Sequence, residues 1–190
     1  MNALGLRIKS GFAIGIVASG DARAWTVVSR HDVPLTNGTG EYARFPFHPT
    51  LELNDERAAH EASKRAIDAI EATARKEIAA LLKSVARLDA AALVVGSLID
   101  PAKIGNTHMR AHASEGQLYR EIVGRELDRH DLARDTLVER DAYAFVSQRL
   151  KCIEVDLRAD IDVHGKKMVK PWRADEKLAA LAAYWRLREH

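Results

Sequence analysis

Residues that could do chemistry gather in one stretch of the chain, residues 94–116. The stretch begins in an apolar run, passes through a loop broken by Pro101 and Gly105, and enters a predicted helix. The start of that helix carries His, Arg and Glu side chains at positions where apolar residues would be expected. We therefore expect a functional site, if the chain has one, to lie here.

Glu115 lies on the side of the predicted helix that turns toward the core. Counting back by helical intervals from Leu118 places Glu115, and then His108, on the same stripe as the apolar residues. A buried carboxylate is costly unless it is paired or hydrogen-bonded. Glu115 is therefore either a functional acid or an internal brace that pairs with Arg110 or Arg140.

A second group of polar residues is predicted at one edge of a parallel sheet. Residues 90–98 form a short, almost wholly apolar run that is typical of a central parallel strand, and Ser97 lies near its end. Glu139 and Arg140 end the next predicted strand. Ligands of open α/β folds usually bind at the carboxyl ends of the strands, beside the start of the following helix. Glu115 and Glu139 are thus the candidate catalytic acids.

His108 and His112 have the i, i+4 spacing of two metal ligands on one helical face, and Glu115 could supply a third. The pair lacks the internal Glu of the zinc-protease motif. In a chain with eight histidines one such spacing is expected by chance, and solvated or capping histidines would give the same pattern. The sequence therefore predicts neither a metal site nor a cofactor.

The same helix start suits an anion. Asn106 or Thr107 can cap the helix, and its free N–H groups and dipole favour negative charge. Lys103, His108 and Arg110 surround this point, so a phosphate is the natural ligand. The simpler alternative is an ordinary capped helix without a ligand.

Length and composition limit the number of domains, the kind of partner and the presence of disulfides. A chain of 190 residues can bury a sizeable core as one domain, residues 1–190. Charged residues make up 29% of the sequence with a formal net charge of +2, which permits nucleic-acid binding without the basic excess of a dedicated binder. Cys152 is the only cysteine, so an internal disulfide is excluded and a reducing, cytoplasmic location is expected.

The N-terminal segment is the one region that resembles a targeting signal, because Arg7 and Lys9 precede an apolar run, residues 12–18. A period of two favours a strand instead. The run is also too short to span a bilayer, and no other segment approaches the roughly 20 residues needed, so we expect no membrane partner. The residues that carry the period of two are Leu6, Ile8, Phe12, Ile14 and Ile16.

The predicted elements alternate between strands and helices, which specifies an α/β fold. A first strand over residues 4–17 is followed by a hairpin partner over 24–30, and a short edge strand is predicted over 42–47. After these come a long helix over 55–88, a strand over 90–98, a helix over 107–130, a strand over 136–138 and helices over 143–150 and 174–188. Residues 152–163 match both a strand pair and a helix, and the strand pair, turning at 164–165, is preferred.

This order of elements resembles the ribonuclease H-like superfamily: a mixed sheet that starts with an antiparallel hairpin and continues with parallel strands joined by crossover helices. The local segment Pro171-Trp172-Arg173-Ala174-Asp175-Glu176-Lys177 is similar to a motif of that superfamily's Holliday-junction resolvases. The resemblance implies the fold for most of the chain. It also implies an aspartate in the first strand and a glutamate near the end of the fourth, about where Lys9 and Ser97 stand here.

Two-metal phosphodiester cleavage needs several carboxylates around a pair of cations, and an ammonium at Lys9 would oppose metal binding. We therefore expect a divergent nuclease or a nucleic-acid binder without the usual metal site, in which Lys9 and Arg110 contact phosphate. The full set of candidate ligand-binding residues is Lys9, Ser97, Lys103, His108, Arg110, His112 and Arg140.

Two other functions remain open from the sequence. One is a nucleotide-binding or small-molecule enzyme that uses the anion site, although Gly-rich phosphate loops are absent. The other is a protein-interaction module whose Ala-rich C-terminal helix, with Tyr184 and Trp185, packs on a partner. A homodimer is compatible with either.

Overall fold

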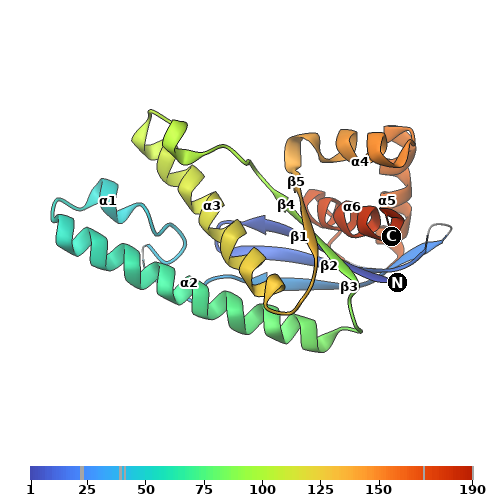
Figure 1. Cartoon of the computed structure of the whole chain (residues 1–190), viewed down its shortest axis with the longest axis horizontal. Helices are drawn as coiled ribbons and strands as arrows, with labels where there is room; N and C mark the ends of the chain where they lie inside the picture. The colour runs from blue at the N-terminus through green and yellow to red at the C-terminus, as the bar shows by residue number, and fades with distance from the viewer. Residues whose placement is uncertain (22–23, 39, 41, 169, 190) are drawn as a thin grey trace.

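A five-stranded mixed sheet forms the centre of the computed structural model (Figure 1). The structure describes residues 1–21, 24–38, 40, 42–168 and 170–189. The strand order is β3-β2-β1-β4-β5. β2 is antiparallel to its neighbours β1 and β3, whereas β4 is parallel to β1 and β5 is parallel to β4. This confirms the predicted mixed sheet. The strands are β1 (Asn2–Lys9), β2 (Phe12–Gly20), β3 (Trp25–Pro34), β4 (Ala90–Val95) and β5 (Arg134–Val138).

The single strand predicted over residues 4–17 is in fact the hairpin of β1 and β2. A two-residue turn at Ser10 and Gly11 pairs Lys9 with Phe12, and Gly11 supplies the positive φ of 86° that such a turn requires. Pairing in this register places Ile14 and Ile16 of β2 on the opposite face of the sheet from Leu6 and Ile8 of β1. Ile8 accordingly packs in one core cluster and Ile16 in the other. The turn was missed because the period of two is interrupted only by Ser10 and continues on the other side of it.

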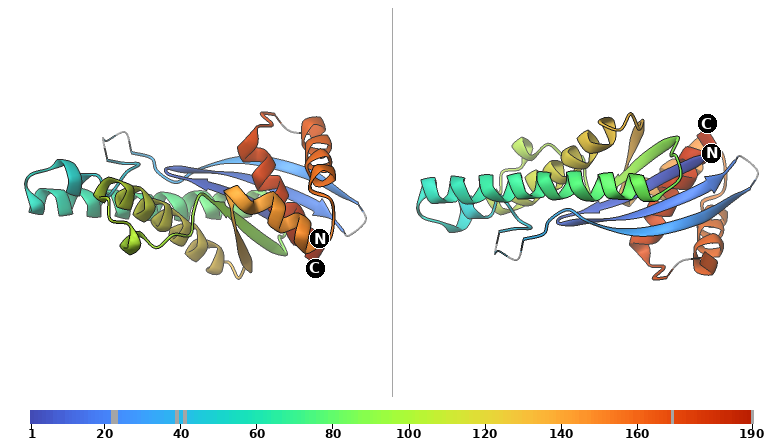
Figure 2. Two further views of the ribbon diagram at one scale, coloured as in Figure 1. Left: turned by 90° about the horizontal axis from the view of Figure 1, so that it is seen from above. Right: turned by 90° about the horizontal axis from the view of Figure 1, so that it is seen from below.

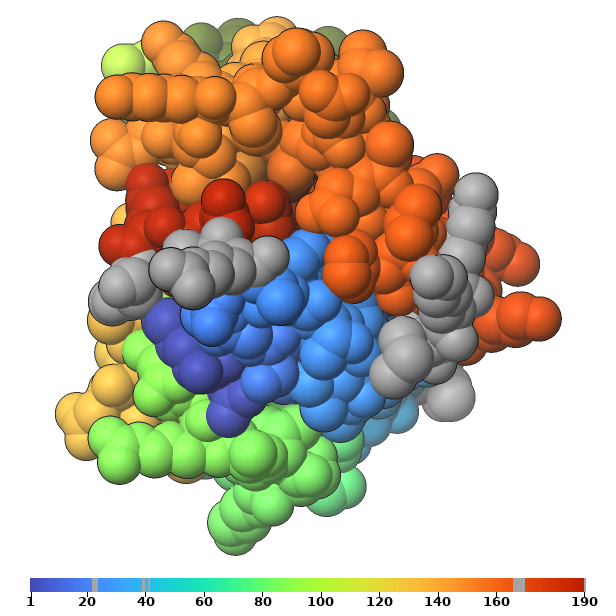
Figure 3. Space-filling model, turned by 90° about the vertical axis from the view of Figure 1, so that its right-hand side faces the viewer, coloured from blue at the N-terminus to red at the C-terminus, as the bar shows by residue number. Residues whose placement is uncertain are grey.

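Helices form a layer on each side of the sheet (Figures 1 and 2). The long helix α2 and the helix α3 cover one face, with α2 extending along much of the long axis of the molecule, and α4, α5 and α6 cover the other. Figure 3 shows α4 and α5 in orange above the blue strand residues, with green residues at the carboxyl end of α2 below. The helices are α1 (Pro49–Glu52), α2 (Glu56–Ser84), α3 (Thr107–Asp128), α4 (Ala142–Leu150), α5 (Glu154–Met168) and α6 (Ala174–Glu189), with 3-10 turns η1 (Pro101–Lys103) and η2 (Glu139–Asp141).

Helix α6 packs directly on the strands β1, β2 and β4. Its approach to β1 is closest at Gly5, where an added Cβ would lie 1.8 Å from the carbonyl oxygen of Ala179. Tyr184 and Trp185 are 8% and 4% exposed within this layer. The prediction that these two residues present α6 to a partner protein is therefore wrong, because the sheet and α4 already bury them.

Two further elements differ from prediction. Residues 42–47 contain turns and no strand, because the chain there wraps toward α3 and not along the sheet edge. Residues 154–168 form the helix α5 in place of a strand pair, with Leu157 and Ile161 buried at helical spacing against α6. None of the described helices has the length and apolar character needed to cross a membrane.

Candidate functional site

The carboxyl ends of β1 and β4 open into a cleft that α3 closes on one side. Its volume is about 470 Å³, and its walls come from the β1–β2 turn, the loop after β4 and the inner face of α3. Among its lining residues are Arg7, Lys9, Arg44, Ser97, His112 and Tyr119. This is the position at which open α/β sheets usually bind ligands.

The Lys and Arg side chains that line the cleft are not accompanied by acidic side chains in the part of the lining that the structure describes. Arg7, Lys9 and Arg44 are cations at neutral pH, and no Asp or Glu is among the described residues that line the cleft. The lining residues are therefore positive, and Glu139 and Asp175, which lie outside the lining, pair with Arg7 and Lys9 and offset part of that charge. Arg44 forms no ion pair with a carboxylate among the described residues, so it is the cation most available to an anionic ligand.

Arg7 is a buried cation at the base of the cleft, with 4% of its surface exposed. Its Nη1 donates hydrogen bonds to the carbonyl oxygens of Ile8 at 2.7 Å and Val94 at 3.3 Å. Its Nη2 donates to Oε2 of Glu139, and its Nε lies 3.5 Å from Oδ1 of Asp175. The guanidinium thus links β1, β4, η2 and α6 at one point.

Lys9 continues this network on the side toward solvent. Its Nζ donates a hydrogen bond of 2.9 Å to Oδ2 of Asp175, and its side chain is 37% exposed. The carboxylates of Glu139 and Asp175 are therefore matched by the guanidinium of Arg7 and the ammonium of Lys9. The pair of divalent cations that the fold resemblance implies does not fit here, because the carboxylate charge that would attract them is already compensated.

Arg44 comes from the loop before α1 and lines the cleft beside the β1–β2 turn. Its Nε donates a 2.6 Å hydrogen bond to the carbonyl oxygen of Ser10, and its guanidinium lies 5.8 Å from the ring centre of Phe12 and 5.3 Å from that of Phe45. The hydroxyl of Tyr119 donates to the carbonyl oxygen of Arg44 at 2.9 Å. Burial raises the pKa of Tyr119 well above its usual value, and the nearby charge of Glu115 raises it further, so the phenol stays protonated.

Glu115 is fully buried and is held by two imidazoles. Its Oε1 lies 2.8 Å from Nδ1 of His48, and its Oε2 lies 3.2 Å from Nδ1 of His112. The prediction that Glu115 lies on the core-facing side of α3 is therefore confirmed. The alternative in which Arg110 or Arg140 braces it is wrong, because both guanidiniums bond elsewhere.

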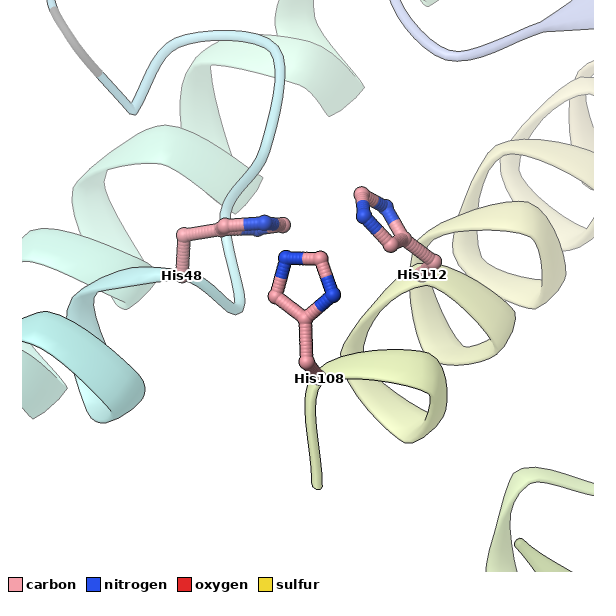
Figure 4. A group of neighbouring side chains, drawn as sticks. All are labelled: His48, His108 and His112. Carbon is pink, nitrogen blue, oxygen red and sulfur yellow. The ribbon is translucent and has the colours of Figure 1, made fainter. Parts of the chain in front are cut away.

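His48, His108 and His112 form a compact group beside the cleft. Figure 4 shows His48 reaching from the loop that precedes α1 toward His108 and His112, which extend from the first turns of α3. The ring centres lie 5.4 Å (His48–His108), 4.9 Å (His48–His112) and 4.6 Å (His108–His112) apart. One ligand nitrogen from each ring lies within 4.8 Å of the others, which makes this the candidate metal-binding group of the described residues.

The remaining predicted residues lie at the edges of the cleft or outside it. The carbonyl oxygens of Ile104 and Gly105 accept hydrogen bonds from Arg110, which lines a smaller, separate depression. Arg140 is exposed and pairs with Asp141, and this hydrogen bond raises the pKa of Arg140. The structure brings Lys9, Ser97 and His112 into the cleft, and it does not bring Lys103, His108, Arg110, Glu115, Glu139 and Arg140 into the lining.

Four residues that shape this region were not predicted as site residues from the sequence: Arg7, Arg44, His48 and Asp175. Arg7 could have been predicted as a site residue, because a charged side chain in a central, otherwise apolar strand must find a partner. Asp175 lay within the quoted resolvase-like segment. Arg44 and His48 lie in a loop, where no periodicity marks which side chains turn inward.

Comparison with known proteins supports the fold. No protein-family model matches the chain, and no curated protein matches its sequence. Among solved structures, that of Thermus thermophilus RuvC matches with a TM-score of 0.55 and 12% identity over 100% of this chain and 96% of that one. The structure of T. thermophilus RuvC in complex with a Holliday junction substrate matches with a TM-score of 0.58 and 11% identity, covering 97% and 92%. The chain thus has the ribonuclease H-like fold that the order of elements predicted.

Proposed function

On this ribonuclease H-like scaffold, we propose that the chain binds the phosphodiester backbone of nucleic acid in the cleft at the ends of β1 and β4. The observation that carries the proposal is the lining: Arg7, Lys9 and Arg44 are cations, and no described lining residue is acidic. One similar structure is of a protein bound to a Holliday junction, which favours nucleic acid over other anions.

Lys9 and Arg44 are the residues we assign to phosphate contact. Both reach the cleft from its rim, and both keep exposed surface. Arg7 is buried, and its two terminal nitrogens bond to Glu139 and to backbone oxygens, so its part is to hold positive charge at the base. Phosphates bind well where backbone and guanidinium donors converge, because such charge-assisted hydrogen bonds are short and strong.

We propose binding without two-metal cleavage at this edge. Glu139 and Asp175 are tied to Arg7 and Lys9, which leaves no group of free carboxylates for a pair of divalent cations among the residues described at this edge. Glu115, the other acid that the sequence suggested for catalysis, is buried against two histidines. Neither predicted acid therefore projects into the cleft as a free base.

The test is fluorescence anisotropy with labelled single-stranded, duplex and four-way-junction DNA at low salt. Lys9→Ala and Arg44→Ala should each weaken binding about tenfold to a hundredfold, the usual effect of losing one charge-assisted hydrogen bond. Lys64→Ala is the matched control, because Lys64 is an exposed cation on α2 that pairs with Asp68 and lies outside the cleft. If the wild-type protein binds none of these DNAs, or if all three variants bind equally well, the proposal is wrong.

A nucleotide is the second candidate ligand, and the size of the cleft favours it. A volume of about 470 Å³ lies within the ~300–1,000 Å³ range of small-molecule sites. A free nucleotide would displace labelled DNA from the cleft if both use Lys9 and Arg44. Nucleotide binding that survives Lys9→Ala and Arg44→Ala would place the nucleotide elsewhere.

A further inference from the structure

We propose that His48, His108 and His112 form a site for one transition-metal ion, for which Zn²⁺ is the best match, with Glu115 as the carboxylate that orients two of the ligands. This site shares His112 with the lining of the cleft, but it does not depend on the phosphate-binding function proposed above. It also departs from the absence of metal that the sequence alone predicted.

The hydrogen bonds of Glu115 determine which ring nitrogens are free. An ionised carboxylate only accepts hydrogen bonds, so Nδ1 of His48 and Nδ1 of His112 must each carry the proton that faces it. When these imidazoles are neutral, each keeps a lone pair on Nε2, the nitrogen that points away from Glu115. A metal-bound histidine typically has this arrangement, in which the other ring nitrogen donates to a carboxylate.

Burial of Glu115 gives a reason for a cation nearby. The carboxylate is 0% exposed, and no Lys or Arg bonds to it among the described residues; the two histidines are its charge-related partners. A buried carboxylate supported only by neutral imidazoles is costly. A divalent ion on the far side of both rings would offset that cost through the two polarised imidazoles.

The three rings need only small movements to coordinate an ion. Tetrahedral zinc with bonds of about 2.0–2.1 Å places its ligand nitrogens roughly 3.4 Å apart, and one nitrogen of each ring already lies within 4.8 Å of one nitrogen of each of the other two. His108 and His112 are exposed, so their side chains can turn. His48 is better fixed, because it is 12% exposed and its ring contacts Phe45 at 5.2 Å.

The ligand chemistry selects the class of metal. Three neutral imidazoles suit zinc, copper, nickel or cobalt, whereas magnesium prefers oxygen ligands. Three protein ligands also leave one coordination position for water, as in open zinc sites. Zinc is therefore the ion to test, with cobalt as its spectroscopic substitute.

The experiment is calorimetry of the full chain, freed of metal and of any histidine tag, with Zn²⁺, Co²⁺ and Mg²⁺. A Cys152→Ser background removes the exposed thiol that could bind zinc on its own. We expect one equivalent of Zn²⁺ to bind, Co²⁺ to give an absorption spectrum typical of nitrogen ligation, and Mg²⁺ to show no saturable binding. Circular dichroism of each variant checks that the fold is retained.

His108→Ala should abolish the stoichiometric site, because His108 is an exposed ligand whose removal leaves the hydrogen bonds of Glu115 intact. Glu115→Gln should keep the ligands and weaken zinc binding about tenfold to a hundredfold, since one imidazole loses its acceptor. His60→Ala, an exposed histidine of α2, is the matched control and should bind like the parent protein. The proposal is overturned if the parent chain binds no Zn²⁺ or if His108→Ala binds it as tightly as His60→Ala.

Discussion

Arg7 shows how one residue can change the chemistry of a sheet edge. Its guanidinium lies where β1, β4, η2 and α6 meet, and it takes Glu139 and Asp175 as partners. Both carboxylates keep some contact with solvent, at 43% and 26% side-chain exposure, whereas Arg7 is buried. Removing the arginine would therefore leave two acids close together that water can only partly solvate.

Arg7→Met is the substitution that tests this role, because methionine preserves much of the buried volume and removes the charge. We expect the free energy of unfolding to fall by roughly 2–3 kcal/mol, the cost of breaking a charged hydrogen-bond network when the partners stay in place. Urea denaturation monitored by circular dichroism measures the change.

Lys9→Met is the companion variant, and its smaller effect should be within about 1 kcal/mol because Lys9 is partly exposed and screened by solvent. Equal decreases in the free energy of unfolding for the two variants would mean that Arg7 is no more important to the fold than an ordinary surface cation.

At the scale of single elements, the packing of β1 against α6 depends on Gly5. A Cβ at this position would lie 1.8 Å from the carbonyl oxygen of Ala179, so Gly5→Ala must push the helix away from the sheet. We expect a decrease of about 3 kcal/mol or more in the free energy of unfolding, at the upper end for overpacked cores. Gly15→Ala is the control, because its Cβ would meet its nearest atom, in Leu6, at an ordinary 3.4 Å. Similar chemical denaturation midpoints for the two variants would contradict the close packing described here.

The sequence predicted most elements because their patterns are local. The long helix α2, the buried strand β4 and the helix α6 each carry an apolar pattern that needs no knowledge of their neighbours. The turn at Ser10 and Gly11 was missed because apolar alternation continues through it. The helix α5 was missed because a period of two and a helical period coexist there, and packing against α6 decides between them.

The candidate site could be predicted only where its residues share an element. Glu115 and His112 lie three residues apart on α3, so helical geometry alone brings them together. His48 and Glu115 are 67 residues apart, and Arg7 and Glu139 are 132 residues apart. No local pattern encodes such pairs, because they arise when the loop before α1 and the strand ends fold onto one another.

At the scale of the whole molecule, charge is nearly balanced and the cleft is a local exception. The chain has 29 basic and 27 acidic side chains, not counting histidine, for a formal charge of +2. Many exposed cations are paired on their own helices, as Arg57 and Lys64 are with Glu61 and Asp68 on α2. A net charge this small attracts nucleic acid only weakly over the whole surface, so binding must depend on where the positive charge is concentrated.

A pair of double variants separates a local site from general attraction. Lys9→Ala/Arg44→Ala and Arg57→Ala/Lys64→Ala each remove two positive charges, so the net charge changes equally in both. If the cleft holds the DNA backbone, the first variant should bind duplex DNA far more weakly than the wild-type protein. The slope of its plot of log affinity against log salt should become shallower by about 0.9 for each phosphate that is no longer neutralised, or roughly 1.8 for two phosphates. The second variant should keep the wild-type slope, because its charges lie on α2 outside the cleft. Anisotropy titrations at several salt concentrations measure both slopes, and equal slopes for the two double variants would show that net charge, and not the cleft, governs binding.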